Sequence, residues 1–105
     1  MEILLGVNMR VFLVVHGIVQ GVGYRSYVKR IAIRNTIKGS VMNAEDGSVH
    51  VFAEGSPENL KAFEKEINIS MERGPQVHHI ERFEEPGKVP KDPGSYDGFV
   101  IEKDY

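Results

Sequence analysis

The sequence predicts a single α+β domain in which two helices cover one face of an antiparallel sheet of four to five strands. Three observations indicate this class: an apolar run at Val11–Val15, a hairpin signal at Asp46-Gly47, and two segments with the apolar periodicity of helices. In chain order the first six elements are strand, helix, strand, strand, helix, strand, and a short last strand follows them. That order is the split βαβ arrangement of a ferredoxin-like sandwich.

The first strand covers residues 10–16 and is expected in the interior of the sheet. Every residue from Val11 to Val15 is apolar, so both faces of the strand would be buried. Gly17, Gly21 and Gly23 follow, and they let the backbone bend without Cβ clashes. The strand therefore ends in a Gly-rich turn.

A helix is predicted over residues 24–35. Its apolar and aromatic residues recur at helical spacing, which places Tyr24 and Tyr27 on the buried stripe. The full stripe comprises Tyr24, Tyr27, Val28, Ile31 and Ala32. We expect the helix to end near Asn35, a residue type that adopts a left-handed conformation almost as Gly does.

Residues 38–43 and 48–54 are predicted to form two strands joined by residues 44–47. Asp46-Gly47 is strong hairpin chemistry, and both residues are expected to serve the turn alone. Ser56 and Pro57 then stand in the order expected of a helix cap and a first-turn proline. The buried stripe of this second helix is Leu60, Phe63 and Ile67.

The last third of the chain is predicted as strand, loop and strand. Gly74-Pro75 interrupts the chain before a weaker strand over residues 77–83. Residues 86–95 form a loop rich in Pro, Gly and Lys, and residues 98–102 form a last strand whose register the sequence does not fix.

Length and composition restrict the function classes. The chain has 105 residues, 41% of them hydrophobic, which makes one domain over residues 9–105 with residues 1–8 as an N-terminal extension. With no Cys, there is no disulfide, thiolate metal site or Cys nucleophile. Residues 1–8 lack a positive region and a long apolar run, so a cytoplasmic protein without membrane contact is the default.

The net charge of −2 conceals an asymmetry along the chain. Residues 1–42 carry six basic residues and one acidic residue, whereas the remainder carries seven basic and fourteen acidic residues. A positive first helix beside the Gly-rich turn would steer a small anion toward Arg25. A solvated charged face explains the same run of charges equally well.

Arg25 falls where the Gly-rich turn meets the first helix. N–H groups without helical partners and the positive end of the helix dipole favour a phosphate or carboxylate at such a point. A cation there is locally unfavourable, so Arg25 makes better sense if an anion lies between its guanidinium and the loop amides. The alternative is a tight turn beside a solvated Arg, and a Gly-rich turn alone does not decide between them.

Two long motifs make the chain resemble the acylphosphatase family, small enzymes that hydrolyse the anhydride between a carboxylic acid and phosphate. The first is GIVQGVGYR, residues 17–25, and the second is KGSVMNAEDGSVHVFAEG, residues 38–55. Gly74-Pro75 and Gly98-Phe99 resemble later landmarks of the family, and the match spans nearly everything after Met9. The resemblance implies that an oriented water attacks small acyl phosphates directly, giving carboxylate and inorganic phosphate.

The resemblance also implies a role for each site residue. Arg25 matches the Arg that holds the phosphoryl group, and Asn43 matches the Asn that orients the attacking water. The backbone N–H groups that match the phosphate-cradling loop belong to Val19, Gln20, Gly21, Val22, Gly23 and Tyr24.

The residue types are suited to these roles. A carboxamide is not a base, so Asn43 could place the water but could not remove its proton, and a phosphate oxygen of the substrate is the expected acceptor. An acyl phosphate already carries a good leaving group, so positioning and charge stabilisation can suffice. Such a reaction needs no metal, no cofactor and no covalent intermediate.

The implied partners are a small acyl phosphate as substrate and inorganic phosphate as product or inhibitor, and a monomer is the expected state. A rival from another class is a non-catalytic module of the same fold that senses a phosphate-bearing ligand and does not turn it over. Nucleic-acid binding is disfavoured, because no strand shows the paired aromatic and basic residues that stack bases.

Some residues depart from the family pattern. Ser40 stands where the family often has an aromatic residue, Asn35 where it often has Gly, and His78 and His79 replace small residues. These departures concern the substrate pocket, the end of the helix and strand pairing more than the anion site.

Several polar residues keep a second interpretation. Asn43 precedes a turn and, without the resemblance, reads as a turn residue bonded to its own backbone. The side chains of Gln20 and Ser26 could touch a phosphate or simply bond the local backbone. The four histidines show no zinc-site spacing; they are His16, His50, His78 and His79.

Overall fold

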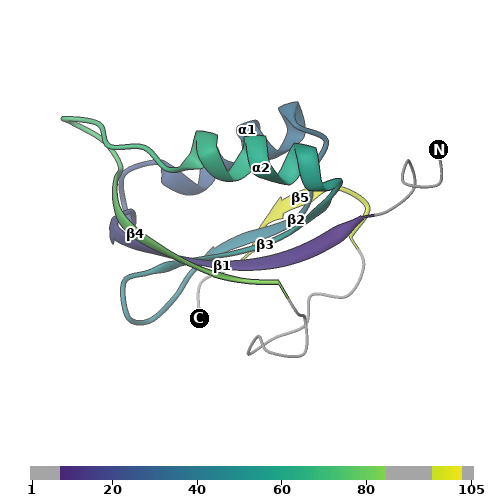
Figure 1. Ribbon diagram of the computed structural model, residues 1–105. Helices are drawn as coiled ribbons and strands as arrows, with labels where there is room; N and C mark the ends of the chain where they lie inside the picture. Colours follow the sequence, from purple (N-terminus) through teal and green to yellow (C-terminus); the bar gives the residue numbers. More distant parts are fainter. Residues whose placement is uncertain (1–7, 85–95, 103–105) are drawn as a thin grey trace.

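The computed structural model describes residues 8–84 and 96–102 and contains two helices above a five-stranded sheet (Figure 1). The elements are β1 (Met9–Ile18), α1 (Tyr24–Arg34), β2 (Lys38–Asn43), β3 (Val49–Gly55), α2 (Pro57–Ile67), β4 (Gln76–Phe83) and β5 (Phe99–Ile101). The predicted ferredoxin-like α+β fold is confirmed. Residues 1–7 of the predicted extension and the predicted loop 86–95 lie outside the described residues.

The strand order is β4-β1-β3-β2-β5, so β1 lies in the sheet interior as its two apolar faces predict. The pairs β1/β4, β1/β3 and β2/β3 are antiparallel. β5 instead pairs in parallel with β2, with Phe99 opposite Gly39. The prediction of a wholly antiparallel sheet is therefore wrong at this edge, where a short strand joins β2 from a distant part of the chain.

The sheet register brings the turn after β1 and the end of β2 to the same side of the sheet, where both strands end. β1 and β2 both pair antiparallel with β3 and so run in the same direction. Val49 of β3 pairs with Val15 on one side and with Asn43 on the other, and these three residues form one row across the sheet. At the usual spacing of strands, this row spans about 10 Å from Val15 to Asn43. The turn after β1 and the end of β2 are therefore neighbours.

The hydrophobic core lies between the sheet and the helices. Leu13, Val15, Val28, Val41, Val49, Val51, Phe63 and Ile67 are fully buried, and Phe99 of β5 packs against Phe63 of α2. Full burial of each such side chain stabilises the fold by about 1.5–3 kcal/mol. Neither described helix is both long and apolar enough to span a membrane.

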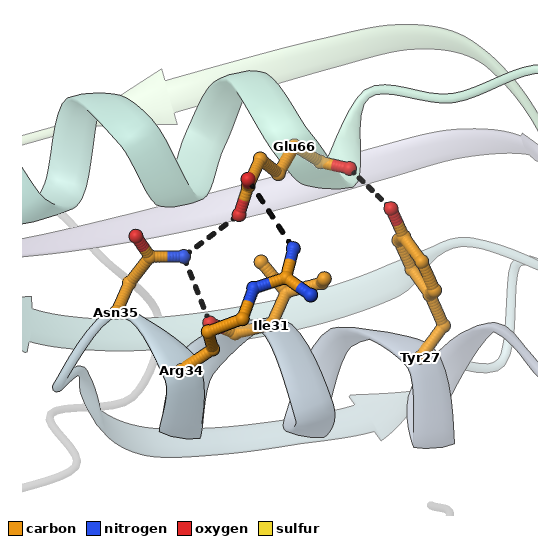
Figure 2. Close-up of polar contacts among 5 residues, drawn as sticks. All are labelled: Tyr27, Ile31, Arg34, Asn35 and Glu66. Atoms are coloured by element: carbon orange, nitrogen blue, oxygen red, sulfur yellow. Dashed lines mark hydrogen bonds and ion pairs between the residues drawn. The ribbon is translucent and has the colours of Figure 1, made fainter.

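Side chains of α1 cap the carboxyl end of α2 (Figure 2). The Tyr27 hydroxyl donates to the Glu66 carbonyl at 2.7 Å, and the Tyr24 hydroxyl donates to the Ile67 carbonyl at 2.8 Å. These carbonyls have no partner inside their own helix. Burial, together with neighbouring Tyr27, raises the pKa of the Tyr24 hydroxyl, which keeps it a donor.

The end of α1 differs from the prediction by one residue. Asn35 has φ −100°, and Thr36 takes the left-handed conformation at φ +58°. Thr36 N–H bonds to Ile33 and Ile37 N–H bonds to Ala32, which is the Schellman pattern. Asn35 is held elsewhere: its Nδ2 donates to the Ile31 carbonyl at 2.9 Å and to Glu66 Oε1 at 2.8 Å (Figure 2).

Candidate functional site

The turn between β1 and α1 has a backbone that only certain residues adopt. Gly21 has φ +75° and Gly23 has φ +80°, both in the left-handed region. A Cβ added at either position would meet nothing within 4 Å. The turn therefore requires these glycines for their conformation rather than for space. The side chain of Val19, at the start of the turn, is buried in the hydrophobic core and fixes the turn to it.

α1 begins in the way expected of an anion-binding terminus. Gly23 occupies the cap position, no side chain there accepts a hydrogen bond from the first-turn amides, and the first turn holds no acidic residue. Arg25 is the second residue of the helix and is half-buried. The first-turn N–H groups and the positive end of the dipole thus lie at the same end of α1 as the cationic Arg25.

Asn43 is the last residue of β2 and is only 7% exposed. Its row partners Val49 and Val15 belong to the core cluster beneath the helices, so Asn43 lies on the helix-covered face of the sheet. α1 begins at the same edge (Figure 1). The register therefore places the carboxamide of Asn43 on the same face and at the same edge as the Gly-rich turn.

The hairpin after Asn43 is closed by other residues. Ala44 N–H bonds to the Ser48 carbonyl at 2.9 Å, and Gly47 N–H bonds to the Ala44 carbonyl at 3.2 Å. Asp46 Oδ1 accepts from the backbone N–H of Ser48 at 2.9 Å and from its hydroxyl at 2.6 Å, which lowers the pKa of Asp46. The prediction that Asp46-Gly47 forms the turn is confirmed, and the Asp46 carboxylate makes local bonds within that turn.

The Gln20 side chain connects the turn to this hairpin, a contact that the sequence analysis missed. Its Nε2 donates to the Ala44 carbonyl at 2.8 Å and to the Ser48 carbonyl at 2.9 Å. Neither carbonyl is local in sequence, so Gln20 does not make the local backbone bond considered above. Its amide hydrogens are also committed to these carbonyls rather than to a phosphate. The signal in the sequence that could have indicated this contact was a long amide side chain within the Gly-rich turn.

His16, His50 and His79 lie on the face of the sheet opposite Asn43. Val15 and Val49 face the helices, so the adjacent residues His16 and His50 face the opposite side of the sheet. There His16 stacks with His79 and contacts Glu81 Oε1 at 3.0 Å, while burial lowers the pKa of His50. Within residues 8–84 and 96–102 no group of three or more His or acidic residues could hold a metal ion.

Comparison with known proteins points to one family. The family model described as Acylphosphatase matches residues 11–101. The acylphosphatase of Thermotoga maritima is 49% identical over 53 residues, which is 50% of this chain and 59% of that protein. The chain therefore spans somewhat under two thirds of this relative.

Two further proteins are similar over more of the chain. A protein of Methanocaldococcus jannaschii named probable carbamoyltransferase HypF is 41% identical over 85 residues, covering 80% of this chain and 11% of that protein. The crystal structure of acylphosphatase from Bacillus subtilis has a TM-score of 0.76 at 29% identity, and covers 90% of this chain and 98% of that one. Because the family model matches most of its length, the chain belongs to the acylphosphatase family.

Proposed function

We propose that this protein is an acylphosphatase that hydrolyses small acyl phosphates to a carboxylate and inorganic phosphate. The observation that carries the proposal is the meeting at one sheet edge of an α1 start without a side-chain cap, a half-buried Arg25 and a buried Asn43. Membership of the family agrees with this activity, and the names of the relatives match it.

In the proposed reaction the phosphoryl oxygens are held by the Arg25 guanidinium and by backbone N–H groups of the turn. Those N–H groups are the ones named from the resemblance, from Val19 to Tyr24. These donors stabilise charge on the phosphoryl oxygens as the transition state forms. The fork of Arg donors fits two oxygens at once.

Asn43 supplies position rather than proton transfer. Its Oδ1 accepts a hydrogen bond from a water and aligns that water with phosphorus. The water oxygen bonds to phosphorus, the bond from phosphorus to the acyl oxygen breaks, and the carboxylate leaves with the electron pair. One proton of the water passes to a phosphoryl oxygen and the other stays on the attacking oxygen, so the products are a carboxylate and dihydrogen phosphate, which then equilibrates with hydrogen phosphate by losing a proton to solvent.

Other properties remain part of the proposal. We propose a monomer in the cytoplasm that works without a metal or cofactor, and inorganic phosphate as a competitive inhibitor. The single domain over residues 9–105 also stays a prediction. Because one relative is named a carbamoyltransferase, carbamoyl phosphate belongs among the acyl phosphates to be tested.

The test is steady-state hydrolysis of acetyl, benzoyl and carbamoyl phosphate in the presence of a chelator, with inorganic phosphate as competitor. We expect turnover that the chelator does not reduce and that phosphate inhibits competitively. Phosphate binding without turnover of any of these substrates would support the rival sensing module instead.

Asn43→Ala is the sharpest variant for this assay. We expect kcat to fall about 100-fold or more, because a misplaced nucleophile loses orientation. Asn59→Ala is the matched control, since Asn59 lies on α2 and contributes only its backbone N–H to the helix cap. Equal turnover in wild type and Asn43→Ala would contradict the role assigned to Asn43.

A further inference from the structure

Gln20 belongs to the turn through its backbone and to the neighbouring hairpin through its side chain. A primary amide has two N–H donors, and the Nε2 of Gln20 contacts two carbonyls, those of Ala44 and Ser48. These two residues are the first and last of the hairpin loop, and Ala44 directly follows Asn43. The contacts are partly buried, so water competes with them less than at an exposed site.

The hairpin does not need Gln20 in order to form. Each of the two carbonyls already accepts a backbone bond, from Gly47 N–H at Ala44 and from Ala44 N–H at Ser48. The Asp46 carboxylate also ties to Ser48. The added bonds therefore fix where a preformed hairpin lies relative to the turn.

We propose that Gln20 is a positioning residue that sets the distance between the phosphate held by the turn and the water held by Asn43. This inference rests on the proposed function. The backbone N–H of Gln20 is one of the amides assigned to the phosphate, and its side chain ends one residue from Asn43. Gln20 thus links the turn that holds the phosphate to the hairpin that follows Asn43. These two segments are more than twenty residues apart in the sequence.

The consequence is a separation of kinetic effects. Gln20→Met keeps the backbone N–H and nearly the same side-chain length, but removes both donors. Phosphate binding by the turn should persist while Asn43 loses its fixed position. We expect kcat to fall about 10- to 100-fold, with KM and the inhibition constant of inorganic phosphate changed less than about twofold.

The experiment measures kcat, KM and phosphate inhibition for wild type, Gln20→Met and Gln76→Met. Gln76 provides the same chemical change on β4, where its backbone pairs with Ile18 and where no residue is assigned to the site, so its variant should match wild type. Circular dichroism checks that each variant is folded. Should Gln20→Met fail to fold, Gln20→Asn gives the same test, because its amide is one methylene too short to reach both carbonyls.

A second arm asks whether Gln20 acts through Asn43. In an Asn43→Ala background, adding Gln20→Met should lower the residual kcat by less than about twofold, because the group it positions is gone. A purely structural role would give the same loss in both backgrounds.

The outcomes separate this inference from the function beneath it. Wild type that hydrolyses none of the acyl phosphates removes the proposed function and this inference with it. Active wild type with an unchanged Gln20→Met removes the inference alone. It is also overturned if phosphate inhibition weakens in step with kcat, since Gln20 would then be holding the turn itself.

Discussion

The two helices of this domain are the same length and begin in opposite ways. α2 has Ser56 at its cap, with Oγ accepting from Asn59 N–H at 3.1 Å, then Pro57 and acidic Glu58 in the first turn. α1 has Gly23 at its cap, no side-chain cap bond and no acidic residue in the first turn. The chain thus gives α2 a side-chain cap and gives α1 none, and the missing cap agrees with the anion that we propose for the start of α1.

The largest expected effect comes from Arg25, the cation at the start of α1. Arg25→Ala should lower kcat/KM about 1,000-fold or more, because it removes a charged donor from the phosphoryl group in the transition state. The measurement is steady-state hydrolysis of benzoyl phosphate. Arg34→Ala, at the exposed far end of the same helix, removes the same charge and should leave activity unchanged.

Equal losses in Arg25→Ala and Arg34→Ala would indicate general steering by a positive helix. The contribution of Arg25 to activity would then come from the long-range electrostatic field of α1 and not from a specific contact with the phosphoryl group.

The next prediction gives α1 an acidic cap like those found at ordinary helix starts. Asp and Asn both tolerate the left-handed conformation, and the space around Gly23 accepts a side chain. Gly23→Asp should raise KM and the phosphate inhibition constant about 10-fold or more beyond Gly23→Asn, because its carboxylate occupies the place of the anion. Titration with inorganic phosphate measures the difference, and identical affinities in the two variants would argue against an anion at this terminus.

The sequence predicted the start and the buried stripe of α2, but placed the left-handed residue at the end of α1 wrongly, for a physical reason. Every signal for α2 is local: the Ser56 cap, the proline after it and one apolar stripe. The end of α1 is decided by a tertiary contact, since Asn35 bonds Glu66 on the other helix and the left-handed residue becomes Thr36. Residue type alone could not place that contact.

The candidate site shows the same division. The turn and its glycines were predicted from local chemistry. The residues alone left the anion-binding role of Arg25 open, family resemblance assigned the roles of Arg25 and Asn43, and both roles stay predictions. The bonds from Gln20 to Ala44 and Ser48 depend on sheet register, which the sequence leaves open. The parallel pairing of β5 escaped prediction in the same way, since a three-residue strand carries little signal about its partner.

A smaller effect is expected at the start of α2. Ser56→Ala removes the side-chain cap and should cost about 1 kcal/mol of unfolding free energy, which corresponds to a melting temperature lower by about 4–8 °C. Activity measured well below that temperature should not change. Thermal unfolding followed by circular dichroism measures the melting temperature. A loss of turnover would show that the two helix starts are not functionally separate.

The smallest effect concerns Glu66, an acidic residue near the carboxyl end of α2, where a negative charge opposes the helix dipole. The chain compensates for it internally: the Asn35 amide, and after it Arg34, hold the pKa of Glu66 below its usual value. Arg25 is the corresponding case at the start of α1, where a positive charge opposes the helix dipole. We propose that the substrate phosphate offsets that charge.

A lowered pKa in the folded state means that ionised Glu66 favours folding. The contribution should be complete above the unfolded-state pKa of about 4.3 and should vanish as the pH falls through the lower folded-state value. Glu66→Gln keeps an acceptor for Asn35 and removes only the charge. Its small deficit in unfolding free energy, measured with urea, should be constant near neutral pH and disappear in acid. A deficit independent of pH would mean that Glu66 contributes by shape and hydrogen bonding alone, and that its negative charge at the carboxyl end of α2 has no measurable effect on folding.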